Sequence, residues 1–315
     1  MLKYIVKRLL IALIVLFGIT VIDFAIMSLA GNPVEIMSGG PRVSQEILRV
    51  RAQNMGLDKP LVWQYFTWLK AILGGDFGYS YKNYEPVSEM IGTHLGPTLL
   101  LMGSALVLSL IIASAAGIYS AVHQNTAGDY AIVSLAFLGQ SIPGFLLAII
   151  LIYIFTVRLG ILPSGGMRTL GSEGTGPELK YLIMPVLVLA FEESGRNIRY
   201  IRSSMLEILG KDYLRTARAK GIGRFKVIYK HALRNALIPI VTVIGMELPA
   251  LFGGAVIVEE VFSWPGLGLM TMNAILARDY PVIMAMCLIS AVVVLLGNLA
   301  VDIIYVFLDP TVRLD

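Results

Sequence analysis

The residues of this sequence best suited to chemistry are carboxylates placed in apolar segments. Glu192 and Glu193 stand side by side at the end of one such segment, and Glu247 interrupts another, the run from Ala236 to Val258. An ionised carboxylate is costly inside a bilayer and usually faces other protein groups or water. We therefore predict that these glutamates line a polar path, where they could contact the cationic group of a solute.

A structural interpretation of the same carboxylates is equally open. At helical spacing, Glu192 or Glu193 could form an ion pair with Arg196 or Arg199. A carboxylate that is used in this way holds its own helix together and contacts no solute. For Asp23, which interrupts the first apolar run, we favour a position near a membrane interface.

Catalytic patterns are missing from the sequence. The three histidines, His94, His123 and His231, are far apart, and no H-E-x-x-H zinc motif occurs. Ser141 lacks the second glycine of a G-x-S-x-G nucleophile elbow. The single cysteine, Cys287, lies in an apolar run, so we expect neither an intrachain disulfide nor a cysteine-based metal cluster. An intramembrane enzyme is therefore the less favoured class.

The composition indicates a membrane protein. The chain has 315 residues, of which 57% are hydrophobic and 15% charged, and its mean hydropathy is +0.77. Soluble domains are about 45–50% apolar and about 25% charged, so a soluble enzyme is nearly excluded. The net charge is only +4, and we expect no nucleic-acid partner.

Six segments are candidates for membrane-spanning helices, which need about 20 apolar residues. The fourth is weak, because it meets charged residues soon after it begins, and it could be a re-entrant segment. The first could be a signal peptide, but an uncleaved helix is favoured because further spans follow. The six candidates are Leu9 to Ala30, Leu95 to Val122, Tyr130 to Val157, a segment from Tyr181, Ala236 to Val258, and Tyr280 to about Leu308.

The distribution of basic residues predicts the orientation of these spans. The segment from Arg196 to Arg234 holds eleven of the 25 lysines and arginines, which places it in the cytoplasm by the positive-inside rule. Six spans then put both termini on the cytoplasmic side. The predicted fold is an all-α membrane protein with six transmembrane helices. Its parts are residues 1–30 (tail and first helix), 31–94 (extracytoplasmic segment), 95–308 (five-helix core with the loop 196–235) and 309–315 (cytoplasmic tail).

The extracytoplasmic segment is predicted to contain two short helices. Ser44 can cap the first, which ends at Gly56, and Pro60 opens the second. Trp63 and Trp68 of the second helix could lie at the lipid headgroups. The segment could be a small cap over the outer ends of the spans or a docking platform for an extracytoplasmic partner, and both remain open.

The cytoplasmic loop is predicted to contain a helix that docks on another protein. No proline occurs from Ser203 to Gly221, and Gly221 and Gly223 can end a helix. Ala217 and Ala219 leave little bulk near that end, so a second protein could approach closely. A basic helix could alternatively be attracted to anionic lipid.

Several short motifs follow one another along the whole chain. They are GLDKP at 56–60, GDFG at 75–78, DYLRTARAKG at 212–221, HALRNALIP at 231–239, VEEVFSWPGLG at 258–268, RDYP at 278–281 and DP at 309–310. With these motifs in this order, the chain resembles the permease subunits of bacterial ABC importers, in the form of the dipeptide, oligopeptide and nickel branch. Two departures are a turn without basic residues at 123–129 and the sequence AGNP at 30–33, and neither implies a different function.

The resemblance implies a type I ABC importer permease fold in a bacterial cell membrane and a set of partners. These partners are a homologous second permease, two ATP-binding subunits and an extracytoplasmic solute-binding protein, with lipid around the spans. ATP and Mg²⁺ would bind the partner ATPases, and no cofactor is expected in this chain, which lacks a G-x-x-x-x-G-K-[ST] phosphate loop. The resemblance implies that ATPase coupling uses Asp212, Arg215, Ala217, Arg218, Ala219 and Gly221.

The implied function is that of a pore subunit that alternates between inward-open and outward-open states. The first-ranked solute is a dipeptide or oligopeptide, and a nickel complex is the alternative. A stand-alone channel is a third hypothesis, which the large basic loop disfavours. Pro143 and Gly144, Pro185 and Pro249 are candidate bending points, because proline removes a backbone hydrogen bond.

Overall fold

The computed structural model describes residues 2–29, 31, 34, 45–54, 56–169, 171, 177–233, 245 and 255–308. Within these residues the regular structure is helical, and the one extended pairing is an isolated bridge between Tyr79 and Pro86. The chain is therefore all-α in its described part, as the sequence predicts.

In the described part of residues 31–94, α3 and α4 follow α1 and precede α5. The helix α1 spans Leu2–Leu29, α3 spans Gln45–Asn54 and α4 spans Leu61–Leu73. The cap Pro60 precedes α4 as expected, because proline fits the first turn of a helix. The remaining elements are α5 (Val87–Val122), α6 (Ala127–Ser141), α7 (Gly144–Leu151), η1 (Ile152–Arg158), α8 (Leu179–Leu209), α9 (Asp212–Ala219), α10 (Arg224–Lys226), η2 (Val227–Ala232), α13 (Val256–Val261), α14 (Leu267–Ala277) and α15 (Tyr280–Leu308).

Three described helices are long and apolar enough to cross a bilayer. They are the segments Val6–Leu29, Val87–Val122 and Tyr280–Leu299. The bent pair α6 and α7–η1 would make a fourth span if it crosses as one unit. The predicted span from Tyr181 is a helix, α8, but its charged second half keeps it outside this group. Most of the predicted span Ala236–Val258 lies outside the described residues, so six spans remain a prediction.

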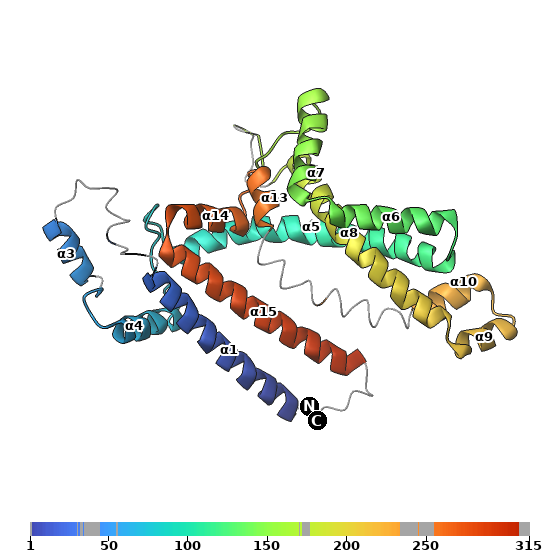
Figure 1. The fold of residues 1–315 in the computed structure, drawn as a ribbon, viewed down its shortest axis with the longest axis horizontal. Coiled ribbons are helices and arrows are strands. Elements are labelled where there is room, and N and C mark those ends of the chain that lie inside the picture. Colours follow the sequence, from blue (N-terminus) through green and yellow to red (C-terminus); the bar gives the residue numbers. More distant parts are fainter. Residues whose placement is uncertain are drawn as a thin grey trace.

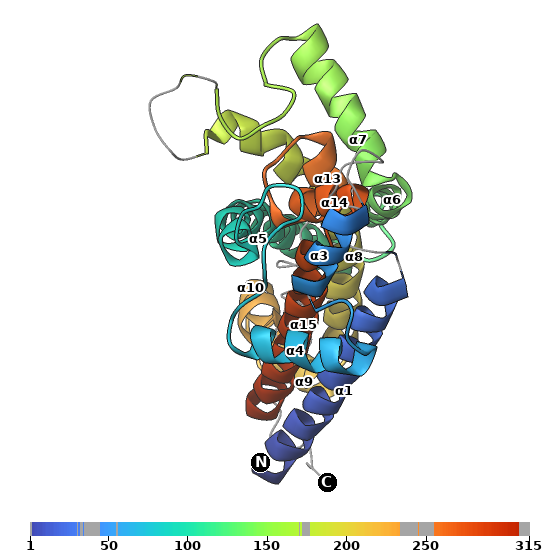
Figure 2. The same cartoon turned by 90° about the vertical axis from the view of Figure 1, so that its left-hand side faces the viewer.

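The helices form two groups. One group pairs α1 with α15, which lie side by side (Figure 1). The other packs α8 against α5 and α6, and α14 and α15 bring the two groups together. The start of α1 and the end of α15 lie at the same end of the molecule, whereas α4 crosses α1 (Figure 2).

The apolar core divides into three clusters along the second group. One lies where α5, α6 and α8 meet α9 and η2, and it includes Ala113, Ile201, Met205, Leu214 and Val227. The second surrounds Trp264 and Phe262, and the third joins the start of α5 to α14 and α15. Burial of these side chains holds the helices together.

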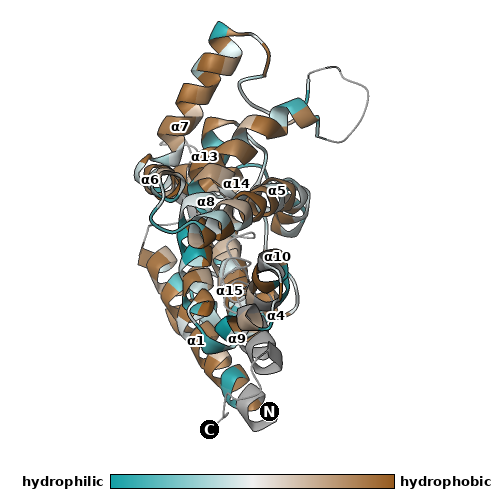
Figure 3. Cartoon of the chain, turned by 90° about the vertical axis from the view of Figure 1, so that its right-hand side faces the viewer, coloured by the Kyte–Doolittle hydropathy of each residue, from teal (hydrophilic) through white to brown (hydrophobic). Residues whose placement is uncertain are grey.

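The outer surfaces of several helices are apolar. Brown, hydrophobic residues cover most of α7 (Figure 3), and Leu13, Ile14 and Ile22 of α1 are strongly exposed. An apolar surface of this extent is typical of contact with lipid or with another membrane subunit.

A sharp bend separates α6 from α7. The predicted span Tyr130–Val157 is not one continuous helix, because α6 ends at Ser141 and α7 begins at Gly144 at an angle of 97°. Ile142 is extended and Pro143, which has no N–H to donate, precedes α7. The bend falls at two of the bending points predicted from the sequence.

Candidate functional site

The segment predicted to dock on another protein forms the short helix α9 at one end of α8 (Figure 1). The prolineless stretch from Ser203 is not one helix, because α8 ends at Leu209 and α9 begins at Asp212. Gly210 forms the intervening turn, where a glycine weakens helix continuation. The sequence interpretation missed this break, because it took the absence of proline as a sign of a continuous helix and did not consider Gly210.

One side of α9 is anchored and the other is open. Leu214 is fully buried in the cluster that contains Ile201, Met205 and Val227. On the other side, the Asp212 and Arg215 side chains are 95% and 79% exposed, with Nη1 of Arg215 3.8 Å from Oδ1 of Asp212. An ion pair so exposed adds little stability, so both charges remain available to a docking partner.

The other predicted coupling residues follow the same division. Ala217 is half-buried against the cluster, and Ala219 is exposed. Arg218 belongs to α9, and only its backbone is among the described parts of the structure. A feature that the sequence interpretation did not single out is Phe225 of α10, six residues after the end of α9, which is 72% exposed.

Gly221 ends the α9 turn in a left-handed conformation. Its φ is +78°, and a Cβ at this position would meet no atom within 4 Å. The N–H of Ile222 donates to the carbonyl of Ala217 at 3.3 Å, which closes the turn. Glycine is therefore required by the backbone conformation and not by lack of space.

Two of the predicted path-lining glutamates share a cavity. Glu192 and Glu193 line a space of about 680 Å³ with Gln140, Arg196 and residues 255–258. The bend between α6 and α7 borders it, because a Cβ on Gly144 would lie only 2.7 Å from Oε2 of Glu192. Glu247 lies outside the described residues.

Arg199 is held by α6. Its Nη2 donates to Oε1 of Gln140, and its guanidinium carbon lies 4.8 Å from the ring centre of Phe137. The cavity lining therefore combines two carboxylates, an amide held by Arg199 and the guanidinium group of Arg196, an arrangement that can bind a solute carrying both charges.

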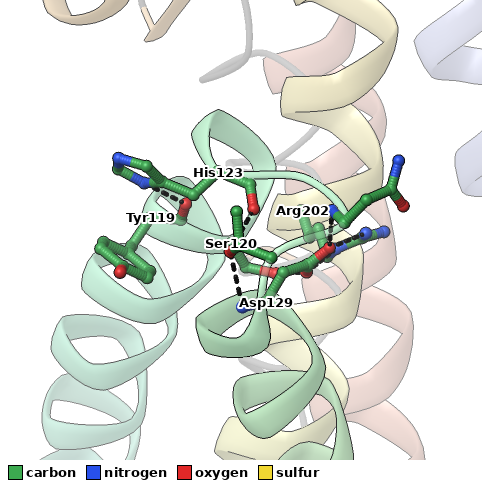
Figure 4. Close-up of polar contacts among 7 residues, drawn as sticks. Tyr119, Ser120, His123, Asp129 and Arg202 are labelled. Atoms are coloured by element: carbon green, nitrogen blue, oxygen red, sulfur yellow. Dashed lines mark hydrogen bonds and ion pairs between the residues drawn. The ribbon is translucent and has the colours of Figure 1, made fainter.

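A buried ion pair near α9 was missed by the sequence interpretation. Nε and Nη2 of Arg202 each lie 2.8 Å from an oxygen of Asp129, and Nε is 2.9 Å from Oγ of Ser120. Ser120 also donates to Asp129. We call Ser120, Asp129 and Arg202 the Arg202 node (Figure 4).

The turn before α6 completes this site. Thr126 caps α6 by accepting from the N–H of Asp129, and Asp129 accepts from the N–H of Asn125 at 2.9 Å. The sequence carries a signal for it, because T-x-x-D at 126–129 is a helix-capping pattern. Nothing local indicates the partner Arg202, which lies 73 residues further along the chain.

The VEEVFSWPGLG motif forms a tight corner between α13 and α14. Glu259 is fully buried and accepts from the hydroxyl of Thr98 at 3.0 Å and from the N–H of Leu269 at 2.9 Å. A Cβ on Gly266 or Gly268 would approach the Glu259 carboxylate to within 2.5 and 2.8 Å. The glycines and the glutamate of this motif are thus required by packing.

The RDYP motif secures the loop before α5. Asp279 is buried and accepts from the hydroxyl of Ser80 and from the N–H of Tyr81 at 2.9 Å. Burial, together with the charge of Asp279, raises the pKa of Tyr81 to about 12. The Tyr81 phenol therefore keeps its proton to a higher pH than an ordinary tyrosine does.

No group of three or more metal-ligating side chains is found within the described part of the chain. Charged and polar side chains are present on α9 and in the cavity lining. Such groups can bind a protein surface or a polar solute.

Comparison with protein families assigns the chain to a class of transport protein. The family of binding-protein-dependent transport system inner membrane components matches residues 113–314, and its N-terminal region matches residues 1–103. The chain belongs to this family. It is thus a permease, a multi-pass membrane subunit of an ABC transporter, and not an enzyme.

Similar proteins extend over the same length. The chain is 43% identical over 316 residues to the oligopeptide transport system permease protein AppB of Bacillus subtilis, covering 99% of this chain and 100% of that protein. It is 43% identical to a putative peptide permease of Brucella ovis, covering 99% of each chain. It is 38% identical to the glutathione transport system permease protein GsiC of Escherichia coli, again covering 99% of each.

Two solved structures share the fold. One is the inward-facing MetNI methionine ABC transporter, with a TM-score of 0.58, 18% identity, and coverage of 70% of this chain and 97% of that chain. The other is an amino acid ABC transporter, with a TM-score of 0.52, 16% identity, and coverage of 69% and 94%. At this identity the likeness shows the fold of a type I ABC importer permease.

Proposed function

We propose that this chain is one half of the transmembrane pore of an ATP-driven importer for dipeptides or oligopeptides in the bacterial inner membrane. The observation that carries the proposal is the full-length similarity to permeases named for oligopeptides, peptides and glutathione. Nothing among these relatives favours a nickel complex as the solute.

The proposed complex contains a homologous second permease as the heterodimer partner, two ATPase subunits that bind ATP and Mg²⁺, and an extracytoplasmic solute-binding protein. In this arrangement the pore forms between the two permeases, and lipid covers the outer apolar faces. The exposed apolar surfaces of α1 and α7 support contact with lipid or a second subunit.

In the proposed topology six helices cross the membrane and both termini are cytoplasmic. Residues 31–94 then lie outside the cell with α3 and α4, and the loop 196–235 lies inside with α9. Residues 1–30, 95–308 and 309–315 are the first helix with its tail, the five-helix core and the cytoplasmic tail. The shared end of α1 and α15 supports placing both termini on one side (Figure 1).

In the proposed mechanism α9 docks on an ATPase subunit and acts as a lever. Asp212, Arg215, Arg218 and Ala219 would meet the ATPase surface, while Ala217 and Gly221 would shape the end of the helix. The open face of α9 and its buried anchor Leu214 support this role. ATP binding would then shift the balance between two pore conformations that differ by only a few kcal/mol.

The solute would pass the cavity at the bend between α6 and α7. There the ammonium end of a peptide would contact Glu192 and Glu193, while the guanidinium group of Arg196 would bind its carboxylate. Glu247 is proposed to line the same path on the basis of its sequence position alone.

The test is purification of the tagged chain from its native membranes, followed by reconstitution of the recovered complex in liposomes. We expect a second permease and two ATPases to copurify, and we expect ATP-dependent uptake of labelled dipeptides or oligopeptides in the presence of the solute-binding protein. Uptake of a nickel chelate without peptide uptake would overturn the peptide assignment. Recovery of this chain alone, active without ATP, would overturn the importer proposal in favour of a channel.

A further inference from the structure

The helix α9 is joined to α8 through a turn and is not a continuation of it. The helix α9 follows α8 only after a break at Gly210, so the two are not one rigid rod. A lever joined through a turn transmits movement only if its other contacts are stiff. The contacts around the end of α8 are therefore decisive.

Apolar packing provides attachment without fixed register. Leu214 of α9 is buried against Ile201 and Met205 of α8 in the cluster that also contains Ala113 of α5 and Ala136 of α6. Hydrophobic association is non-directional, so burial of Leu214 by itself sets no fixed orientation of α9 on α8. Directional polar contacts are needed to fix how α8 is oriented on its neighbours.

The Arg202 node provides directional polar contacts between the helices. It joins one residue from each of three helices: Ser120 at the end of α5, Asp129 in the first turn of α6, and Arg202 in α8. Asp129 is buried, and the Arg202 side chain is 23% exposed. A two-pronged guanidinium–carboxylate contact fixes both distance and orientation.

Close backbone contacts extend this lock along α8. A Cβ on Gly195 would lie 2.4 Å from the carbonyl oxygen of Ala136 in α6, and a Cβ on Gly117 of α5 would lie 2.9 Å from Ile201. Nδ2 of Asn197 lies 3.3 Å from Oγ of Ser109. The locked stretch of α8 thus runs from Gly195 to the node and lies next to the glutamates of the cavity.

We propose that Ser120, Asp129 and Arg202 are positioning residues that make the adjoining parts of α5, α6 and α8 move with α9 as one body. A displacement of α9 is then passed through α8 to the α6–α7 bend and to the cavity lined by Glu192. This proposal rests on the proposed role of α9 as the ATPase lever. It separates attachment of the ATPase, which uses α9, from transmission of its movement, which uses the node.

The experiment compares variants of the purified and reconstituted complex. Removing one partner of a buried pair leaves an uncompensated charge, so Arg202→Met alone confounds transmission with folding. Replacing both partners by apolar residues is often neutral for stability. The informative variants are therefore the double change Asp129→Leu with Arg202→Met, and the single change Arg202→Lys, which keeps the charge and loses the two-pronged geometry. Lys180→Met, which removes an exposed ion pair at the other end of α8, is the matched control.

The quantities measured are recovery of the ATPase subunits and the number of peptides transported for each ATP hydrolysed. We expect both informative variants to bind the ATPases as the parent does. We expect the double variant to transport at least about fivefold fewer peptides per ATP, Arg202→Lys to fall between it and the parent, and Lys180→Met to match the parent.

A purely structural role would give a different result. If either informative variant assembles and transports within the error of the parent per ATP, the node is not a positioning device and the proposal is overturned. If the parent complex itself shows no ATP-driven peptide uptake, the proposed function fails first. The parent and the variants thus separate the two failures.

Discussion

At the residue scale, position 221 requires glycine because its φ angle is positive. A φ of +78° costs an ordinary L-residue roughly 1–2 kcal/mol. The space around it is open, so a side chain there would leave membrane insertion and the core unaffected. Its effect would be confined to the end of α9 and the surface presented to the ATPase.

We therefore predict that Gly221→Asp inserts normally but loses ATPase association or coupling. The matched control is Gly223→Asp, which adds the same charge two residues away at an exposed glycine whose φ is not positive and whose Cβ would meet no atom within 4 Å. Copurification of the ATPases and peptide uptake measure the effect. Parent-like uptake by Gly221→Asp would remove Gly221 from the coupling site.

Glu192 leads to a second prediction at this scale. Loss of a hydrogen bond to a charged group costs about 1.5–3 kcal/mol, so Glu192→Gln should weaken peptide transport by about tenfold or more while the complex still assembles. Glu89→Gln, at an exposed position in the first turn of α5, is the control. Concentration-dependent uptake of labelled dipeptide is the measurement, and unchanged uptake would exclude Glu192 from the solute path.

At the element scale, α9 depends on one buried side chain. Large-to-small changes in a core cost about 2–5 kcal/mol for leucine, and Leu214 is fully buried. Leu214→Ala should therefore release α9 from the end of α8, whereas Leu214→Met, which nearly conserves volume, should not.

Limited proteolysis of the purified protein measures this release. We expect cleavage after Arg215 or Lys220 to be faster in Leu214→Ala, together with lower recovery of the ATPases. Equal cleavage rates in all three proteins would mean that α9 is held by contacts other than Leu214.

At this scale the sequence predicted features that depend on neighbouring residues and missed those that depend on residues far apart in the chain. Pro60 and Pro143 mark the start of α4 and of α7 correctly, because proline acts on its own backbone. The break at Gly210 was missed because glycine only weakens a helix, and tertiary packing decides the outcome. The Arg202 node was missed because its partners lie far apart in sequence and meet only when α6 packs on α8.

At the scale of the whole molecule, the separation of the α1–α15 pair from the α5–α6–α8 group suits a permease whose groups shift against each other (Figure 1). The number of membrane spans is only partly predictable from the sequence. Apolar runs identify spans by length, but within the described residues the charged second half of α8 and the 97° bend leave three or four spans recognisable by composition.

The six-span topology predicts which surface each loop faces. In a Cys287→Ser background, single cysteines at Asn83 and Gln124 occupy exposed positions in the loops before α5 and after α5. We expect a membrane-impermeant thiol reagent to label Asn83→Cys in intact cells, and Gln124→Cys only after permeabilisation. Labelling of both in intact cells would contradict the topology.

The pairing of α1 with α15 affects the order in which the protein can be completed during synthesis. Asp23 of α1 is buried beside the thiol of Cys287 in α15, yet roughly 250 residues separate the end of α1 from the start of α15. At about 5–20 residues per second, the ribosome needs on the order of ten seconds to a minute to deliver the missing helix. During that interval the nascent chain carries a carboxyl group in its first helix without its final neighbour, so a chain cut short before α15 retains that defect and is a natural target for membrane quality control.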